Sequence, residues 1–353
     1  MNRGLAGRLW MVLLTTVAVG IVLPVVAQVP PTKKGPVPPT KGPVPPQKGP
    51  VGPTTKGPVP PSAVSPTAPK APAPPQKKGP KLPEPEPVSL ETKDGMYIKA
   101  TFYPGTLKKD AVPFILVHGL DGQGGDMHGL ATYLQSLGHA VIAPDLRGHG
   151  QSKSQKRPDG STVTLDPDKL TRPALEAMIL DIQACKKFLL EKNNTGDLNI
   201  EQLCVVGAEF GAILAVRWAA MDWTTQDLPA YKLGKDVKAL VLLSPPPTYK
   251  AVSLREALTV PAVSSSIAML IVAGADDPKA SSEAEKLHKQ LQSSHSKSAD
   301  DKDLFVLKPE TTLSGAKLLA PTLDIKEKIA SFVEKAVVSK KTQYAWQDRK
   351  NPL

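Results

Sequence analysis

The chain has 353 residues, with 44 lysines and arginines against 33 aspartates and glutamates, which gives a formal net charge of +11. The excess of positive charge lies in the N-terminal part of the chain. Residues 1–87 hold eleven basic and two acidic side chains, whereas the remainder holds 33 basic and 31 acidic ones. Because the remainder is nearly neutral, this charge distribution argues against a nucleic-acid-binding domain.

The first 27 residues have the composition of an export signal. Arg3 and Arg8 precede an apolar stretch over residues 9–26, broken by Pro24 and followed by Ala27. A positive start, an apolar core and small residues at the end are typical of a secretory signal peptide over residues 1–27. The stretch is also long enough for an uncleaved membrane anchor. Both alternatives predict an exported protein that is periplasmic, secreted or anchored in the cell envelope.

Residues 28–87 form a second, proline-rich segment. They hold 22 of the 38 prolines, and the sequence KGPVPP begins at Lys34, Lys41 and Lys56, with KGPVGP at Lys48. Proline fixes φ and removes a backbone donor, so we predict a disordered, extended linker rather than helix or sheet. The linker is interpreted as a spacer, with a proline-rich ligand for a protein partner as the alternative. Its lysines favour weak association with a membrane or cell wall.

The segment 88–338 is predicted to be one α/β domain, followed by a tail, residues 339–353, whose packing the sequence does not decide. Apolar runs predict strands at 96–104, 113–119, 139–145, 202–207, 238–244, 268–274 and 303–309. Periodic segments predict helices at 127–137, 172–192, after Glu209, 281–291 and 323–338. This alternation indicates a mostly parallel, doubly wound sheet with helices on both faces. Ligand sites of such sheets lie at the carboxyl ends of the strands.

Residues 116–152 carry the most specific motif, LVHGLDGQGGDMHGLATYLQSLGHAVIAPDLRGHGQS. It resembles α/β-hydrolases, in particular esterases, lipases and peptidases similar to monoacylglycerol lipase and serine aminopeptidase. The resemblance implies an oxyanion hole formed by the backbone N–H groups of Leu120 and Phe210. It implies a structural role in shaping the turns for His118, Gly119, Asp145, Arg147, Gly148, His149 and Gly150.

The sequence Gly207-Ala208-Glu209-Phe210-Gly211 has the spacing of G-x-S-x-G, the turn that presents a catalytic serine in this family. Gly207 and Gly211 fit a turn in which strand and helix are too close for side chains. The resemblance therefore places Glu209 at the nucleophile position.

The expected catalytic triad also contains an acid and a histidine base. The sequence offers a candidate for the acid but no histidine at the expected place. Asp277 matches the acid position, although an aspartate before Pro278 also fits a cap of the next helix. The base is expected after the last strand, but no histidine follows Leu304. Ser314 is assigned to the vacated histidine position.

Without an imidazole, a nucleophile lacks the partner that accepts and returns its proton. We therefore predict a catalytically degraded hydrolase that binds a small-molecule ligand or a protein partner through the former active-site cleft. One alternative is an active hydrolase of carboxylic esters or related substrates that uses Glu209 and Asp277. Another is an envelope scaffold in which the proline-rich arm is the functional element. Glu209 itself is expected to lie over the oxyanion hole, with a role as a carboxylate nucleophile as the alternative.

Three further expectations concern cofactors and metals, a cover over the site, and the two cysteines. No cofactor or metal is implied, because no ligand set has suitable spacing. Residues 244–266 are too short for a cap domain, while the loop 151–171 is long enough to overhang the site. Cys185 and Cys204 are interpreted as isolated buried thiols, with a bond between them as the alternative.

Overall fold

The structure is a computed structural model that describes residues 82–156, 159–295 and 303–349. The leader 1–27 and almost all of the proline-rich arm therefore lie outside the described residues. Within the described residues, no helix combines the length and apolar character needed to cross a bilayer.

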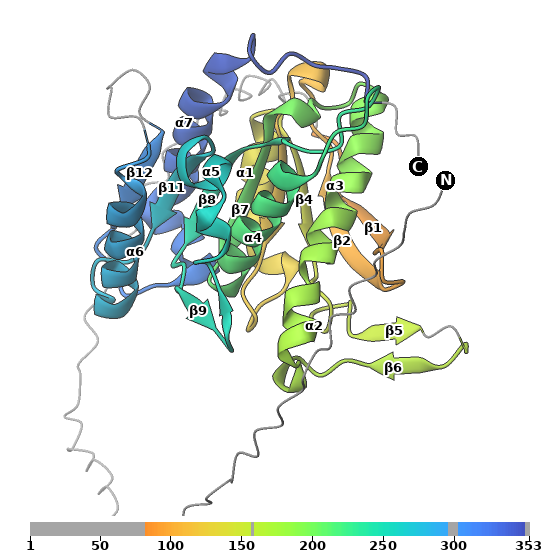
Figure 1. Ribbon diagram of the computed structural model, residues 1–353, viewed down its shortest axis with the longest axis horizontal. Helices are drawn as coiled ribbons and strands as arrows, with labels where there is room; N and C mark the ends of the chain where they lie inside the picture. The colour runs from red at the N-terminus through yellow and green to blue at the C-terminus, as the bar shows by residue number, and fades with distance from the viewer. Residues whose placement is uncertain (1–81, 157–158, 296–302, 350–353) are drawn as a thin grey trace, which may run out of the picture. The chain divides into compact units, whose positions relative to one another are not determined.

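An eight-stranded sheet forms the centre of the domain, in the order β1-β2-β4-β3-β7-β8-β11-β12 (Figure 1). Its strands are β1 (Glu86–Glu91), β2 (Tyr97–Tyr103), β3 (Pro113–Val117), β4 (Ala140–Pro144), β7 (Leu203–Ala208), β8 (Val237–Leu243), β11 (Ala268–Val272) and β12 (Leu304–Leu307). β2 is antiparallel to β1 and β4, and every later pairing is parallel. The predicted α/β architecture is confirmed.

Helices cover both faces of the sheet, as expected for parallel strands that are apolar along their whole length. The helices are α1 (His128–Ser136), α2 (Arg172–Ala177), α3 (Ile179–Asn194), α4 (Phe210–Thr224), α5 (Pro261–Ser265), α6 (Pro278–Leu291) and α7 (Ile325–Ala336). Side chains of α3, α4 and α6 pack into one apolar core, and those of α1 and α7 pack into a second on the opposite face. Buried Trp218 belongs to the first core and Phe332 to the second.

The helices and strands depart from the predicted ones in four places. The single helix predicted over 172–192 is two helices, α2 and α3, that meet at Met178. The first strand, β1, was not predicted; it begins at Glu86, inside the segment assigned to the linker, and pairs with β2. The loop 151–171 contains a hairpin of β5 (Ser154–Lys156) and β6 (Thr162–Thr164). A second small pair, β9 (Thr248–Tyr249) and β10 (Val252–Ser253), follows β8, and no sizeable cap is present among the described residues.

The two cysteines are free and buried, as the first interpretation predicted. Cys185 belongs to the core beneath α3 and α4, and Cys204 belongs to the core on the other face of the sheet. Burial raises the pKa of both thiols, so neither is an activated nucleophile.

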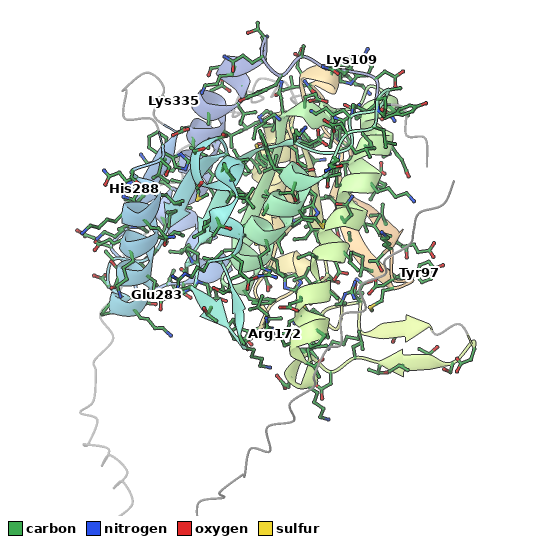
Figure 2. All side chains as sticks on the ribbon, in the orientation of Figure 1. Tyr97, Lys109, Arg172, Glu283, His288 and Lys335 are labelled. Atoms are coloured by element: carbon green, nitrogen blue, oxygen red, sulfur yellow. The ribbon has the colours of Figure 1, made fainter. Side chains whose placement is uncertain are left out.

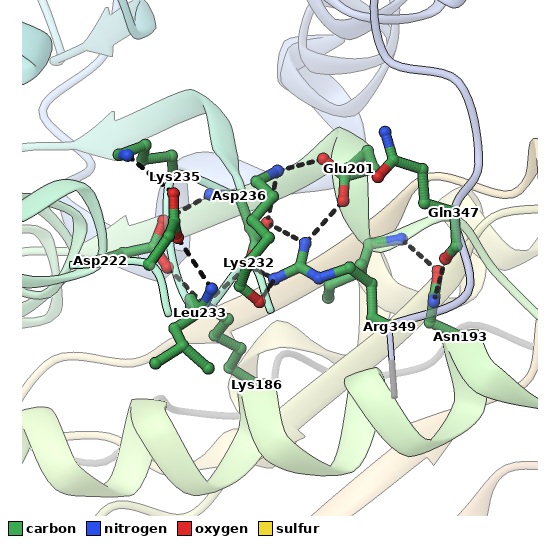
Figure 3. A network of polar contacts seen from close by, with 12 residues as sticks. Lys186, Asn193, Glu201, Asp222, Lys232, Leu233, Lys235, Asp236, Gln347 and Arg349 are labelled. Carbon is green, nitrogen blue, oxygen red and sulfur yellow. Dashed lines mark hydrogen bonds and ion pairs between the residues drawn. The ribbon is translucent and has the colours of Figure 1, made fainter. Parts of the chain in front are cut away.

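The C-terminal segment packs on the domain through a buried ionic network (Figure 3). Nη1 of Arg349 lies 2.6 Å from Oε1 of Glu201 and 2.8 Å from Oδ1 of Asp236. Lys186 reaches Asp236 at 2.7 Å from the other side. Burial alone would lower the pKa of Lys186, but the charges of Asp236 and Asp222 outweigh it and raise that pKa. Three cations and three carboxylates make up the set: Lys186, Lys232, Arg349, Glu201, Asp222 and Asp236.

Replacing Arg349 with methionine is expected to lower the free energy of unfolding by about 3 kcal/mol, because it leaves buried carboxylates without one of their cations. Urea denaturation of the full chain measures this loss. Asp348→Asn changes an exposed neighbour and serves as the matched control. Equal stability of the Arg349→Met and Asp348→Asn variants would show that the network does not hold the tail.

Candidate functional site

The turn between β7 and α4 has a strained residue at its tip. Glu209 has φ 52° and ψ −116°, a conformation that side-chain-bearing residues rarely adopt. The two glycines explain how the turn closes. A Cβ on Gly207 would lie 2.4 Å from the carbonyl oxygen of Gly211, and one on Gly211 would lie 2.4 Å from that of Val117. The chain therefore forms a nucleophile-type elbow with a glutamate at its tip.

The carboxylate of Glu209 lies between two loops that are distant in sequence. Oε1 accepts a hydrogen bond from the hydroxyl of Ser314, with an O–O distance of 2.6 Å. A Cβ on Gly119 would lie 2.7 Å from Oε2, and one on Gly315 would lie 2.7 Å from Cδ. The turn after β3 and the loop after β12 thus meet at this carboxylate, and the positive φ of Gly315 favours glycine at the second contact.

A second serine fixes the loop that carries Ser314. The N–H of Gly315 donates to Oγ of Ser244 at 3.1 Å, and Gly315 has φ +57°. Ser244 directly follows β8 and also has a positive φ, 49°. Ser244 was not predicted as part of the site, because a serine at a strand end carries no pattern of its own. It orients the backbone beside Ser314.

The two residues assigned to the oxyanion hole are chain neighbours of Glu209 and of Gly119, the residue that its carboxylate lies against. Phe210 is the first residue of α4, so its N–H has no acceptor within the helix. Leu120 follows Gly119 in the turn after β3, and its carbonyl lies 2.7 Å from Nε2 of His149. Oε2 of Glu209 lies against Gly119, the residue before Leu120. A negative charge at this place is favoured by the positive end of α4.

His118 orients the turn after β3 through both ring nitrogens. Nδ1 lies 2.6 Å from the carbonyl oxygen of Gly119, and Nε2 accepts from the N–H of Leu146 at 3.0 Å. This pairing requires a neutral ring with its hydrogen on Nδ1. Burial lowers the pKa of His118 to about 4, which keeps the ring neutral at physiological pH. His118 therefore holds the turn and does not face the cleft as a base.

The loop after β4 is held by ionic and glycine contacts. Nε of Arg147 donates to Asp181 at 2.9 Å, and Nη1 donates to Asp94 at 2.6 Å. The carboxylate of Asp145 accepts from the N–H of Gly124 at 2.7 Å. Gly148 and Gly150 have positive φ, and a Cβ on Gly150 would lie 2.3 Å from that carboxylate. Through these contacts, the residues of the motif after β4 fix the conformation of this loop.

An open cleft of about 950 Å³ contains the elbow. Glu209, Ser314 and Asp277 all line it, so the three positions assigned to the triad share one cavity. Asp277 also caps α6, since its Oδ1 accepts from the N–H groups of Lys279 at 3.1 Å and Ala280 at 3.0 Å. No residue of the loop 151–171 lines this cleft, among the residues that the structure describes.

No histidine lines the cleft in the described part of the chain. His288 belongs to α6, and Nδ1 of His295 pairs with Asp303 at 3.0 Å. His128 lies beside Tyr103, 2.9 Å from its hydroxyl. Across residues 82–156, 159–295 and 303–349, no three histidine, cysteine, aspartate or glutamate side chains gather in a metal-binding arrangement. The arrangement can therefore bind through carboxylates and backbone amides, but it has no imidazole to relay a proton.

The rings of His118 and His139 are expected to stay neutral until about pH 4, because burial lowers the pKa of each to about 4. An unfolded chain takes up these protons near pH 6.5, so acid favours unfolding between pH 6.5 and pH 4. Each histidine is expected to cost ~3 kcal/mol of stability across that range. Ring-nitrogen NMR of the folded chain measures both titrations. A midpoint near 6.5 for His118 would contradict its buried, turn-holding position.

Comparisons with known proteins agree with this geometry. Residues 112–300 match the family model described as alpha/beta hydrolase fold. The esterase Pf2001 of Pyrococcus furiosus is 18% identical, with a TM-score of 0.50 over 72% of this chain and 93% of its own. A fungal esterase from Rhizomucor miehei is 15% identical, with a TM-score of 0.52 over 74% of this chain and 84% of its own. At these identities the likeness shows the fold alone. A comparison with curated proteins found no match.

Proposed function

The chain belongs to the α/β-hydrolase fold family, and we propose that it is a member without serine-hydrolase activity whose cleft binds a ligand. The observation that carries the proposal is the hydrogen bond between Glu209 and Ser314, 2.6 Å long. These residues stand where the family has its serine nucleophile and its histidine base. Neither a hydroxyl at the elbow nor an imidazole beside it is available for acyl transfer.

The cleft is suited to binding, because it has a volume of about 950 Å³ and charged residues line it. Asp121, Asp126, Glu209 and Asp277 line it, opposed by Lys317. Such a lining repels polyanions and favours a ligand that brings positive charge. A nucleic acid is therefore a poor partner for this cleft.

Ester hydrolysis by the full chain tests the proposal. We expect no turnover of a short-chain nitrophenyl ester by the wild type or by Glu209→Ser alone. The double variant Glu209→Ser with Ser314→His is expected to gain measurable turnover, because it restores the hydroxyl and the imidazole above Asp277. Adding Asp277→Asn to the double variant is expected to reduce that turnover by at least ~10-fold, since the base then loses its orienting carboxylate.

A second candidate function is an active hydrolase that uses Glu209 as a base. The hydrogen bond between Ser314 and Glu209 also favours this second function, since the hydroxyl of Ser314 lies within proton-transfer distance of Oε1 of Glu209. Turnover by the wild type that disappears in both Glu209→Gln and Ser314→Ala would establish this function and refute the first one. Turnover that survives Glu209→Gln would point to a contaminating esterase.

We also propose that the protein is exported, with the proline-rich residues that precede β1, 28–85, as a spacer that holds the domain in the cell envelope. The charge and apolar pattern of residues 1–27 supports this proposal. Intact-mass measurement of the protein from its own envelope fraction is expected to give a chain that begins after Ala27. A full-length chain that partitions into the membrane would identify the leader as an anchor, and a full-length chain in the cytoplasm would refute export.

A further inference from the structure

Two histidine rings hold the turn after β3. The rings of His118 and His149 are both buried, and their centroids lie 5.2 Å apart. Nδ1 of His118 lies 2.6 Å from the carbonyl oxygen of Gly119. Nε2 of His149 lies 2.7 Å from the carbonyl oxygen of the next residue, Leu120. Two successive carbonyl groups of this turn are therefore each bound by a histidine.

The second ring nitrogen distinguishes the two histidines. Nε2 of His118 accepts a hydrogen bond from the N–H of Leu146 at 3.0 Å, whereas Nδ1 of His149 lies 3.0 Å from the carbonyl oxygen of Arg147. A carbonyl oxygen can only accept, so both contacts of His149 require a hydrogen on the ring nitrogen. A neutral imidazole carries one such hydrogen and an imidazolium carries two. Only the imidazolium form of His149 therefore satisfies both contacts.

The surroundings of His149 also favour a positive charge. Burial alone disfavours a charge on this residue, which is 3% exposed, whereas hydrogen bonds to the charged form and nearby carboxylates favour it. Burial, assisted by the positive charge of His149, lowers the pKa of His118 to about 4, so His118 brings no competing charge. Among the described residues, the charged or titratable groups in and around the two loops are His118, Asp121, Asp126, Asp145, Arg147 and Glu209, with Asp94 and Asp181 paired to Arg147.

The turn that His149 contacts is part of the wall of the cleft. Gly119, Asp121 and Gly122 line the cleft, and the N–H of Gly122 donates to the carbonyl oxygen of Gly119 at 3.0 Å. In a trans peptide group the N–H points away from the C=O. A ring that fixes the carbonyl group of Leu120 therefore also fixes the direction of the N–H of Asp121 in this wall.

We propose that His149 is a positioning residue whose imidazolium ring ties the turn after β3 to the loop after β4. Its two N–H groups donate to the carbonyl oxygens of Leu120 and Arg147. When the ring releases one proton to solvent at higher pH, the bare nitrogen presents a lone pair to a carbonyl oxygen, and the wall of the cleft loosens. This inference goes beyond the proposed function, because it concerns how the wall is held, whether or not the cleft catalyses hydrolysis.

Nitrogen NMR of the full chain, with isotopically labelled histidines, measures the protonation of both rings. At about pH 6, His149 is expected to carry a hydrogen on both ring nitrogens, and His118 on Nδ1 alone. The measurement uses the wild type, so it does not depend on the folding of a variant. A bare ring nitrogen in His149 under these conditions would overturn the proposal, because His149 would then be a neutral buried histidine like His118.

Hydrogen exchange of the Gly122 amide measures whether the turn depends on this charge. Its protection, relative to a free peptide at the same pH, is expected to fall about tenfold from about pH 6 to about pH 9, because a hydrogen bond from a charged donor is lost. His118 stays neutral over this range and does not contribute. His149→Gln is uncharged and has one donor nitrogen, so its protection is expected to be low and constant across the range.

His288→Gln is the matched control, because it changes a histidine that lies on α6 (Figure 2) and does not line the cleft. Its Gly122 amide should follow that of the wild type at every pH. Protection that stays constant with pH in the wild type would overturn the proposal, since His149 would then support the turn without its charge. Equal pH dependence in the wild type and His149→Gln would do the same, because another group would be responsible.

Discussion

The carboxylate of Glu209 is the contact around which the candidate site is arranged. It extends from a strained elbow, accepts a hydrogen bond from Ser314 at 2.6 Å, and lies against two glycines, Gly119 and Gly315. A hydrogen bond to an ionised carboxylate is about twice as strong as one between neutral groups. Since a Cβ at either glycine would meet this side chain, the two glycines leave room for the glutamate, and the hydrogen bond from Ser314 orients it.

The scaffold of the elbow and of its neighbouring turns can be described apart from any chemistry at the site. Glu209, at the tip of the elbow, has φ 52°, and this backbone strain costs about 1–3 kcal/mol. Such a cost is expected where a turn has to present a nucleophile. His118 and Arg147 still fix the turns after β3 and β4 through buried contacts. The fold alone does not settle the function, and the proposed absence of acyl transfer rests on the residues at the elbow and in the loop after β12.

The sequence predicted the sheet well because its central strands are continuous apolar runs, such as those of β3 and β7, that leave little ambiguity. It missed β1, whose EPVSLE alternates weakly and follows a proline-rich segment. Ser314 was assigned to the cleft from its position after the last strand, but its bond to Glu209 spans 105 residues and follows from no local pattern. Ser244 was not predicted, because its role arises from the N–H of Gly315, which the fold brings beside it.

The most direct test of the central claim is the reaction of the full chain with a fluorophosphonate, which adds covalently to activated serines and is read by intact mass. Our account predicts no added mass in the wild type, and one adduct on the elbow serine in the variant with Glu209→Ser and Ser314→His. An adduct on Ser314 of the wild type would contradict it, because it would show that the hydroxyl beside Glu209 is a working nucleophile.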